Sequence, residues 1–430
     1  MKRCWYIVAL ASLLLGRGGI SYSQDYARMS ERTILGTARY VGMGGAMSAI
    51  GGDPSAAHDN MAGLGLYRRS EVLMSFGVGH TNPRTNVTIP QASLVFSLPV
   101  FSEDSKVKFH NFMFSYRRLQ SYNRTVSGAG TYGASLGALI INADTQWDIP
   151  FRTDLYNNTH ALRLVESGSV NEFDFGWAMN ISDQWYVGLG MNVQSYSLSA
   201  NADYDETFDG RQYTINSSSL LYTGTSFSMS AGLIYRPTGW MRLGFGIESP
   251  SVGALSIYSA GTLKAMTDSL RYSYAPDGLS RDRRFHMPLH TSASVAFQIG
   301  AYGLIALQYD FLHQHAEDPL HSLRAGFEVI PVLGLYINAG YAYESSFRRN
   351  TTPVPMDPTF TRQDTYFIRP QGSHYASFAI GYRGAYMMVQ AAYQYRWQGI
   401  NLYAHENSIT PYNIHTDTHR VVLTIGWHQN

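Results

Sequence analysis

The sequence predicts an all-β fold, a 14-stranded antiparallel transmembrane β-barrel with an N-terminal plug (hatch) segment in the lumen. Three observations lead to this prediction. From about residue 70 onward apolar and polar residues alternate along the chain. Short turns in this region alternate with long polar stretches, and residues 24–69 are rich in glycine. Transmembrane barrels combine tight turns at one end with long loops at the other. A secreted β-sandwich or propeller is the alternative, and it would show loops of mixed length.

The N-terminus predicts a secretory signal peptide over residues 1–23. Lys2 and Arg3 precede an apolar run that is too short to span a bilayer, and Ser21–Ser23 supplies small residues for cleavage. The only cysteine, Cys4, lies ahead of this cleavage position. The exported chain would therefore have no cysteine, which excludes disulfides, thiolate catalysis and cysteine-based metal sites.

The composition fits a membrane barrel and argues against other classes. Tyrosine occurs 31 times in 430 residues, and its amphipathic ring suits the membrane–water interface. The net charge is +1 and charged residues are 15% of the chain, so no basic stripe indicates nucleic-acid binding. Gly42, Gly44 and Gly45 form only part of a dinucleotide-binding loop, with no βαβ unit after them. No local signature links Ser, His and Asp as in a hydrolase, so we expect neither enzymatic activity nor a cofactor.

Alternation within the predicted strands separates a lipid face from a lumen face. Val187 and Leu189, for example, oppose Gly188 and Gly190. The predicted strands are residues 70–80, 90–99, 107–122, 170–181, 185–204, 218–235, 241–249, 286–299, 301–315, 321–330, 334–345, 373–383, 386–400 and 418–428. Residues 253–275 are interpreted as an extension of the strand before them, reaching above the membrane.

The even strand number predicts the orientation of the barrel in a bacterial outer membrane. Both chain ends would lie in the periplasm, next to short turns such as 181–184, 236–239 and 383–385. The long polar stretches 123–168, 249–285 and 346–372 would then be extracellular.

Residues 24–69 predict a plug because a fourteen-strand barrel is too wide for its own side chains to fill. Eight glycines in this segment permit tight turns and close backbone contacts. The predicted organisation is therefore a signal peptide (1–23), a plug segment (24–69) and an outer-membrane β-barrel (70–430).

The plug sequence resembles the N-terminal signature of the FadL/TodX family of outer-membrane transporters for long-chain fatty acids and other hydrophobic compounds. The segments that carry the resemblance are Ala38–Ala46, Gly51–Ala56 and Asn60–Leu64, in the form common in Bacteroidetes-type bacteria. Met61 stands where the family usually has proline, which would fix φ near −65°. This departure puts the family's usual gating geometry in question.

The resemblance implies a mechanism and a set of residues. Extracellular loops would capture a hydrophobic small molecule and pass it to a pocket in the upper lumen. The plug would then shift, and the ligand would leave sideways through the wall into outer-membrane lipid. The residues expected to fold and gate the plug are Gly42, Gly44, Gly45, Asp53, Asn60, Ala62 and Gly63.

An apolar run within the first long polar stretch is a candidate landing patch for the ligand. Its members are Tyr132, Leu136, Leu139, Ile140 and Ile141. The alternative interpretation is a short helix packed on the barrel mouth.

Two other functions stay open. His313, His315 and Glu317 lie on one strand face and could serve a metal or haemin-binding receptor, although a polar loop rim is the favoured explanation. The barrel could also be a non-transporting subunit that docks another outer-membrane protein in a secretion or assembly complex. Otherwise we expect a monomeric barrel with no metal.

Overall fold

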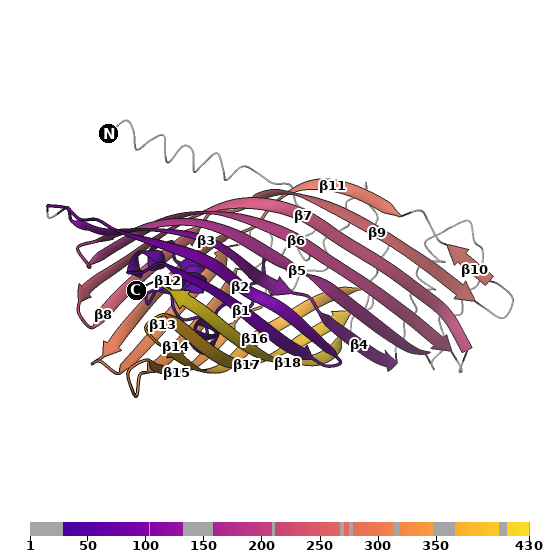
Figure 1. Ribbon diagram of the computed structural model, residues 1–430. Helices are drawn as coiled ribbons and strands as arrows, with labels where there is room; N and C mark the ends of the chain where they lie inside the picture. The colour runs from indigo at the N-terminus through magenta and orange to yellow at the C-terminus, as the bar shows by residue number, and fades with distance from the viewer. Residues whose placement is uncertain are drawn as a thin grey trace.

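The computed structural model describes residues 29–429 except 103, 132–157, 209–210, 267–270, 275–277, 314–318, 347–365 and 404–410. The predicted signal peptide, the predicted landing patch and the residues His315 and Glu317 lie outside the described residues. Within the described part, one antiparallel sheet closes around an N-terminal segment that contains short helices (Figure 1).

The helices inside the barrel are α3 (Ala38–Gly42), α4 (Pro54–Asp59) and the 3-10 helix η1 (Met61–Leu66). The strands are β1 (Glu71–Thr81), β2 (Arg84–Pro99), β3 (Val107–Ser121), β4 (Arg124–Thr131), β5 (Asn158–Ile181), β6 (Trp185–Phe208), β7 (Arg211–Thr238), β8 (Met241–Glu248), β9 (Val252–Met266), β10 (Arg271–Tyr274), β11 (Leu279–His286), β12 (Leu289–Ile299), β13 (Gly303–His313), β14 (Leu320–Val329), β15 (Leu335–Glu344), β16 (Phe367–Arg383), β17 (Met387–Tyr403) and β18 (Tyr412–His428).

Pairing of the first strand with the last one closes the barrel. β1 pairs with β18 from Glu71↔His428 to Thr81↔Thr418, and its other edge pairs with β2. Four of the eighteen strands do not add a position around the barrel. β4 continues β3, since both pair with β5, and β9 continues β8, since both pair with β7. β10 and β11 pair with β9. Fourteen strands therefore surround the lumen, which confirms the predicted barrel and all fourteen predicted strand positions.

The long polar stretches differ from the prediction. The described parts of residues 123–168 and 249–285 are largely strand, because they contain β4, the start of β5, and β9 to β11. β9 continues along β7 from Phe227↔Val252, as expected for an extension, whereas β10 turns back onto β9. The strands β5 to β7 have 24 to 28 residues, well above the roughly 9–11 that cross a bilayer. Pairing satisfies their backbone above the membrane, where both faces tolerate polar residues.

The predicted sorting of connections by length also has an exception. β1 and β2 are joined by Asn82 and Pro83 alone, at the end of the barrel where we expected long connections. At the opposite end, Ser182 and Asp183 have φ of 55° and 58° and make the tight turn that was predicted there. The start of the first strand and the end of the last strand meet at that same end, where the Gln429 amide donates to the Ser70 carbonyl over 3.0 Å.

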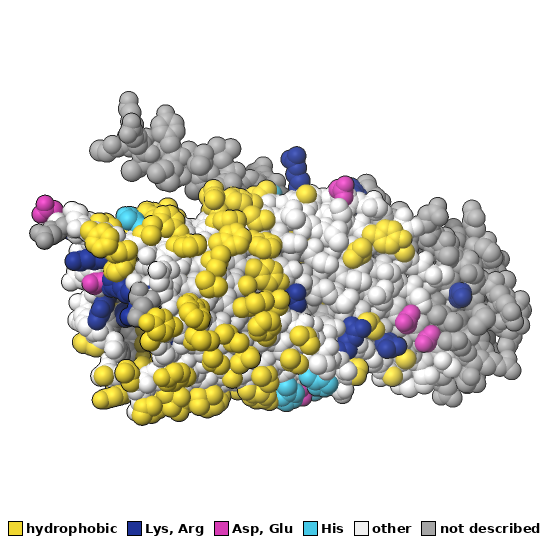
Figure 2. Space-filling view, viewed as in Figure 1, with side chains coloured by type: hydrophobic (Ala, Val, Ile, Leu, Met, Phe, Trp, Pro, Cys, Tyr) yellow, Lys and Arg dark blue, Asp and Glu magenta, His cyan; other side chains and the backbone are white. Residues whose placement is uncertain are grey.

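A band of outward-facing hydrophobic side chains covers the half of the barrel nearer the C-terminus, whereas the described surface of the other half is mainly polar on the face shown in Figure 2. On β18 the outward residues Val421, Leu423, Ile425 and Trp427 are 40–56% exposed. Aromatic pairs such as Trp185 and Tyr235, with ring centroids 4.1 Å apart, lie at its edge. Such a band on a closed barrel is the surface that a lipid bilayer covers.

No helix among the described residues is long and apolar enough to cross a membrane.

Candidate functional site: the lumen of the barrel

The N-terminal segment (residues 29–67) lies inside the barrel, and nearly every residue of it is buried. Each helix begins at a capping side chain. Thr37 caps α3 by accepting from the Tyr40 amide, and Asp53 caps α4 by accepting from the Ser55 amide over 2.8 Å. Asn60 caps η1 by accepting from the Ala62 amide over 3.1 Å. These caps allow a chain with little regular structure to satisfy its polar backbone away from water.

Glycines of the barrel wall make room for η1. A Cβ atom added to Gly188 would lie 2.4 Å from the Met61 carbonyl, and one added to Gly232 would lie 2.0 Å from Asn60 Oδ1. Asn60 Nδ2 also donates to the carbonyls of Ser48 (3.0 Å) and Leu233 (3.2 Å). The buried Met61 side chain fills the space above Gly176 and Gly190, which a smaller proline ring would occupy less completely.

A second contact holds the end of α3 against another part of the wall. A Cβ on Gly42 would lie 2.3 Å from Ala379 Cβ of β16, and one on Gly44 would lie 2.9 Å from the Tyr341 amide of β15. Gly44 and Gly45 have φ of +62° and +76°, a conformation that favours glycine. Gly42 and Gly44 therefore lie where the segment packs directly against the wall.

The remaining predicted residues lie between these two contacts. Asp53 accepts from Thr37 Oγ1 over 2.7 Å, which links α4 to α3. Ala62 is fully buried and packs with Tyr186. Gly63 faces Gly51, and its carbonyl accepts from the Gly52 amide over 3.0 Å. The predicted residues thus form two separate docking points with a connector, and they do not converge on a single site.

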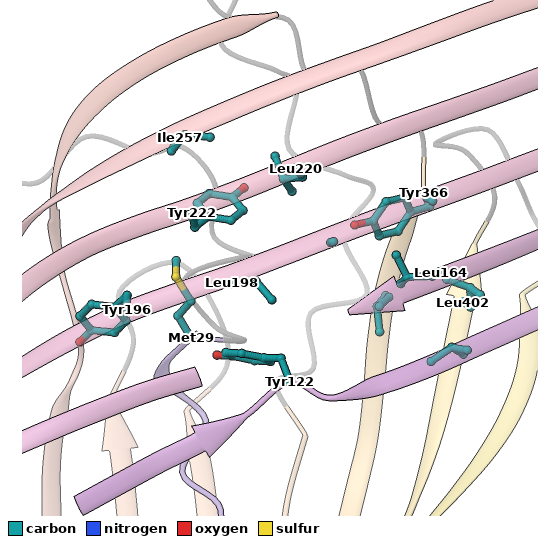
Figure 3. Close-up of a cluster of buried hydrophobic side chains, with 14 of the residues drawn as sticks. Met29, Tyr122, Leu164, Tyr196, Leu198, Leu220, Tyr222, Ile257, Tyr366 and Leu402 are labelled. Carbon is teal, nitrogen blue, oxygen red and sulfur yellow. The ribbon is translucent and has the colours of Figure 1, made fainter. Parts of the chain in front are cut away.

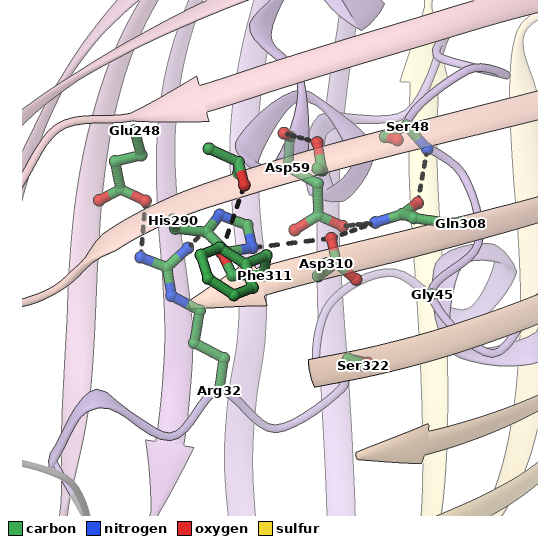
Figure 4. A network of polar contacts seen from close by, with 12 residues as sticks. Arg32, Gly45, Ser48, Asp59, Glu248, His290, Gln308, Asp310, Phe311 and Ser322 are labelled. Atoms are coloured by element: carbon green, nitrogen blue, oxygen red, sulfur yellow. Dashed lines mark hydrogen bonds and ion pairs between the residues drawn. The ribbon is translucent and has the colours of Figure 1, made fainter. Parts of the chain in front are cut away.

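Ion pairs join the segment to the wall at its centre, and Figure 4 shows one of them, between Arg32 and Glu248. Arg324 of β14 lies 3.1 Å from Asp59 and 3.0 Å from Asp310, and the Tyr40 hydroxyl donates to Asp59 over 2.7 Å. Burial would raise the pKa of Asp59, but the guanidinium groups of Arg324 and Arg117 hold that pKa well below its usual range. Burial and the Asp59 charge raise the pKa of Tyr40 to about 12, so its hydroxyl remains a neutral donor.

Two further arginines of the segment pair with wall carboxylates. Arg32 donates to Glu248 of β8 over 2.6 Å, and it also approaches His58 and His290 at 3.1 and 3.2 Å. Arg39 binds both carboxylate oxygens of Glu328 on β14 at 2.7 and 2.8 Å. Breaking such a buried pair by removing one partner typically costs about 3–5 kcal/mol, so loss of either arginine should loosen the seated segment.

One group in the described part of the chain has the residue types and spacing that could hold a metal ion. His58 of α4 faces Glu172 and Asp174 of β5, and one ligand atom of each residue lies within 4.8 Å of the others. His58 Nδ1 is 2.5 Å from Glu172 Oε1 and 4.0 Å from Asp174 Oδ1.

Above the segment, the wall turns apolar side chains inward (Figure 3). We call this group the upper apolar cluster. It comes from β3 to β7, β9, β16 and β17 among others, and includes Leu119, Val126, Leu162, Leu164, Val170, Tyr196, Leu198, Leu220, Tyr222, Leu255, Ile257, Ile368, Ile400 and Leu402. Barrel lumens are usually polar, so this cluster marks a zone that is built for apolar contact.

The cavity that the described residues leave beside the cluster is small. A cavity of ≈ 20 Å³ lies between Met29, Tyr196 and Met287, whereas pockets that hold drug-sized ligands measure about 300–1,000 Å³. A hydrophobic molecule could therefore enter only if side chains or the N-terminal segment moved.

The wall has a weak seam between β2 and β3. β2 pairs with β3 only from Gln91 to Pro99, so residues 84–90 pair with β1 alone. Side chains bridge the seam instead: Arg84 Nη1 donates to Asn123 Oδ1 over 3.1 Å, and Asn86 Nδ2 donates to Ser121 Oγ over 2.9 Å. Behind the seam is a cleft of ≈ 60 Å³ lined mainly by polar side chains, including Thr33, Thr88, Gln120 and Arg420.

Several of these features were not found from the sequence. The upper apolar cluster escaped detection because its members are spread over strands that are far apart in the chain. Glu172 and Asp174 gave a usable signal, since they alternate with the outward residues Phe173 and Phe175. Nothing in the sequence indicated that His58 would face them.

Comparisons with known proteins identify the fold. No protein-family model matches the sequence, and no curated protein does. Among solved structures, a FadL homologue from Pseudomonas aeruginosa matches with a TM-score of 0.58 at 13% identity, covering 93% of this chain and 99% of that one. The CymD monoaromatic hydrocarbon channel gives 0.54 at 12% identity, covering 93% and 98%. The toluene transporter TodX from Pseudomonas putida gives 0.51 at 12% identity, covering 94% and 100%.

The closed barrel with its outward apolar band is a membrane-spanning barrel of the outer-membrane type. Its fold over the whole described chain is the one shared by these FadL-like and TodX-like proteins. The resemblance stated for residues 38–64 therefore agrees with the architecture of the remaining chain.

Proposed function

We propose that this protein transports hydrophobic small molecules, such as long-chain fatty acids, across the bacterial outer membrane. The observation that carries the proposal is the upper apolar cluster. Inward Leu, Ile and Tyr side chains replace the polar lining that a water-filled pore would need. Burying a hydrocarbon chain there gains about 0.8 kcal/mol per CH₂ group.

The route follows from the position of each part. Ligand enters from the end with the tall strands, which we take as extracellular, with both chain ends in the periplasm. It displaces side chains of the upper apolar cluster, while the N-terminal segment below blocks passage to the periplasm. A shift of this segment, hinged at Gly42–Gly45 and Asn60–Gly63, gates the ligand. The seam between β2 and β3 is the candidate lateral exit, since few backbone hydrogen bonds need to break there.

A matched pair of variants on one strand tests this function. Leu198 is buried in the cluster, and the adjacent Ser197 faces outward above the apolar band. We expect Leu198→Glu to abolish uptake of a labelled fatty acid into cells that depend on this protein. Ser197→Glu adds the same charge outside the lumen and should preserve uptake. Normal uptake by both variants, at equal levels of folded protein, would contradict a route through the cluster.

The docking-subunit alternative makes a different prediction. If the barrel only docks a partner, Leu198→Glu would leave its function unchanged, and the barrel would co-purify with another outer-membrane protein. No described contact favours that alternative over transport.

A further inference from the structure

Three buried ionisable side chains meet at the junction between the N-terminal segment and the wall. His58 comes from α4, whereas Glu172 and Asp174 come from the lumen face of β5. All three are at most 3% exposed. The transport proposal uses none of them, so the question of what they hold is independent of it.

The polar atoms that face one another in this group have no hydrogen-bond partner among the described residues. These atoms are both carboxylate oxygens of Asp174, Oε1 of Glu172 and Nδ1 of His58. The contact of 2.5 Å between Nδ1 and Oε1 is close, yet it lacks hydrogen-bond geometry. Buried polar atoms in folded proteins nearly always have partners, and four such atoms around one point are suited to coordinating a cation.

The charges around the group also lack a cation. Five buried carboxylates, those of Asp59, Glu172, Asp174, Glu248 and Asp310, face three guanidinium groups, those of Arg32, Arg117 and Arg324. Arg32 Nη1 lies 3.1 Å from His58 Nε2, so the guanidinium group faces this ring nitrogen while Nδ1 faces the two carboxylates. Carboxylates therefore outnumber guanidinium groups by two in this network, and a divalent ion would offset this excess of negative charge.

We propose that His58, Glu172 and Asp174 bind a divalent transition-metal ion, with Zn²⁺ as the first candidate. One imidazole nitrogen with carboxylate oxygens is a ligand set that zinc accepts, and calcium and magnesium prefer oxygen alone. Gln194 Nε2 donates to Glu172 Oε2 over 2.7 Å and so orients this ligand from behind.

Metal binding at Nδ1 places the ring proton of His58 on Nε2. Arg32 then gives up this contact and keeps two acceptors, Glu248 at 2.6 Å and His290 Nδ1 at 3.2 Å. The ion ties α4 to β5 and so fixes the N-terminal segment to the wall. Removing the ion would loosen this attachment.

Metal content after removal and reloading tests the proposal. The full-length protein, purified in detergent without a histidine tag, is stripped with a chelator, dialysed against Zn²⁺ and washed. We expect elemental analysis to find one zinc per chain, and at least a tenfold loss in Asp174→Asn and Glu172→Gln. Glu328→Gln is the matched control: it removes a buried carboxylate that pairs with Arg39, and it should retain the zinc.

The proposal is overturned if the wild type and Asp174→Asn contain equal amounts of metal, both after loading with Zn²⁺ and after loading with Mn²⁺. That result would mean that a proton shared by the two carboxylates fills the gap. If the variants do not fold, X-ray absorption spectroscopy of the zinc-loaded wild type identifies the atoms that bind the zinc. A first shell with one imidazole supports the site, and a shell of oxygen ligands alone contradicts it.

Discussion

The lower and upper halves of the lumen are filled by opposite means. In the lower half a separate chain segment occupies the space, held by glycine contacts and by ion pairs such as Arg324 with Asp59 and Arg39 with Glu328. In the upper half the wall fills the space with its own apolar side chains, among them Leu164 and Leu198. The lower half is therefore built to close the barrel, and the upper half is built to contact hydrocarbon.

This difference separates two properties that mutations can address individually. Changes in the lower half should alter the seal of the barrel and the seating of the N-terminal segment. Changes in the upper half should alter which molecules enter. The predictions below test whether the two halves are this distinct.

The largest effect is expected from deleting residues 36–63. The fourteen strands keep their pairing, but the lower lumen loses its filling and becomes an aqueous path. We expect a large ion conductance in planar bilayers and loss of fatty-acid uptake, while circular dichroism still reports a β-barrel. A deletion variant that remains electrically silent would show that the wall alone seals the lumen.

Arg324→Met should have the next largest effect. It leaves Asp59 and Asp310 buried without their shared partner, and losses of this type cost about 3–5 kcal/mol. We expect protease cleavage within residues 29–67 to become much faster, with the strands still protected. Lys108→Met, at the far less buried start of β3, is the control and should leave the cleavage rate unchanged.

Gly232→Ala should unseat η1 to a smaller degree. The added methyl group would overlap Asn60 Oδ1 at 2.0 Å, and overpacking of this kind costs about 1–3 kcal/mol. Gly79→Ala places a methyl group no closer than 3.7 Å to Arg420 and serves as the control. Intermittent channel opening is expected for the first variant only, and identical recordings would argue against the glycine contacts as the seat of the segment.

Asn60→Ala should give the smallest of these effects. It removes the cap of η1 and two side-chain donations to backbone carbonyls, and loss of a cap costs about 1 kcal/mol. Urea unfolding in detergent should show a lower midpoint for the N-terminal segment. Asn60→Ser keeps a capping oxygen and should recover part of the lost stability. If Asn60→Ser unfolds at the same midpoint as Asn60→Ala, the effect comes from the two lost side-chain hydrogen bonds to backbone carbonyls and not from the cap.

The sequence predicted the features that depend on local alternation. The residues of β6 are an example, since Gly188 and Gly190 face the lumen and Leu189 faces lipid, as their period of two requires. The same rule was less informative above the membrane: residues 253–275 were expected to extend the preceding strand, as β9 does, but β10 turns back onto β9, and β4 and most of β11 were not predicted as strands. Strands in water can be polar on both faces, so the pattern that marks a strand in lipid is weak there.

Features that depend on distant residues could not be predicted. The seam arises because β2 loses its pairing with β3 beyond Gln91, and sequence alone does not give strand register. The replacement of proline by Met61 raised a question about gating that the sequence could not answer. In the structure, the side chain of Met61 fills the space above wall glycines at 176 and 190, which compensates for the change.

The central claim is that the upper apolar cluster receives a hydrophobic ligand in a barrel that acts alone. The most direct measurement is purification from the native membrane in mild detergent, followed by mass spectrometry of the bound small molecules and proteins. We predict a single barrel that carries fatty acid or a similar hydrophobic molecule, and loses it in Leu198→Glu. A stoichiometric protein partner with no bound hydrophobic molecule would contradict the account.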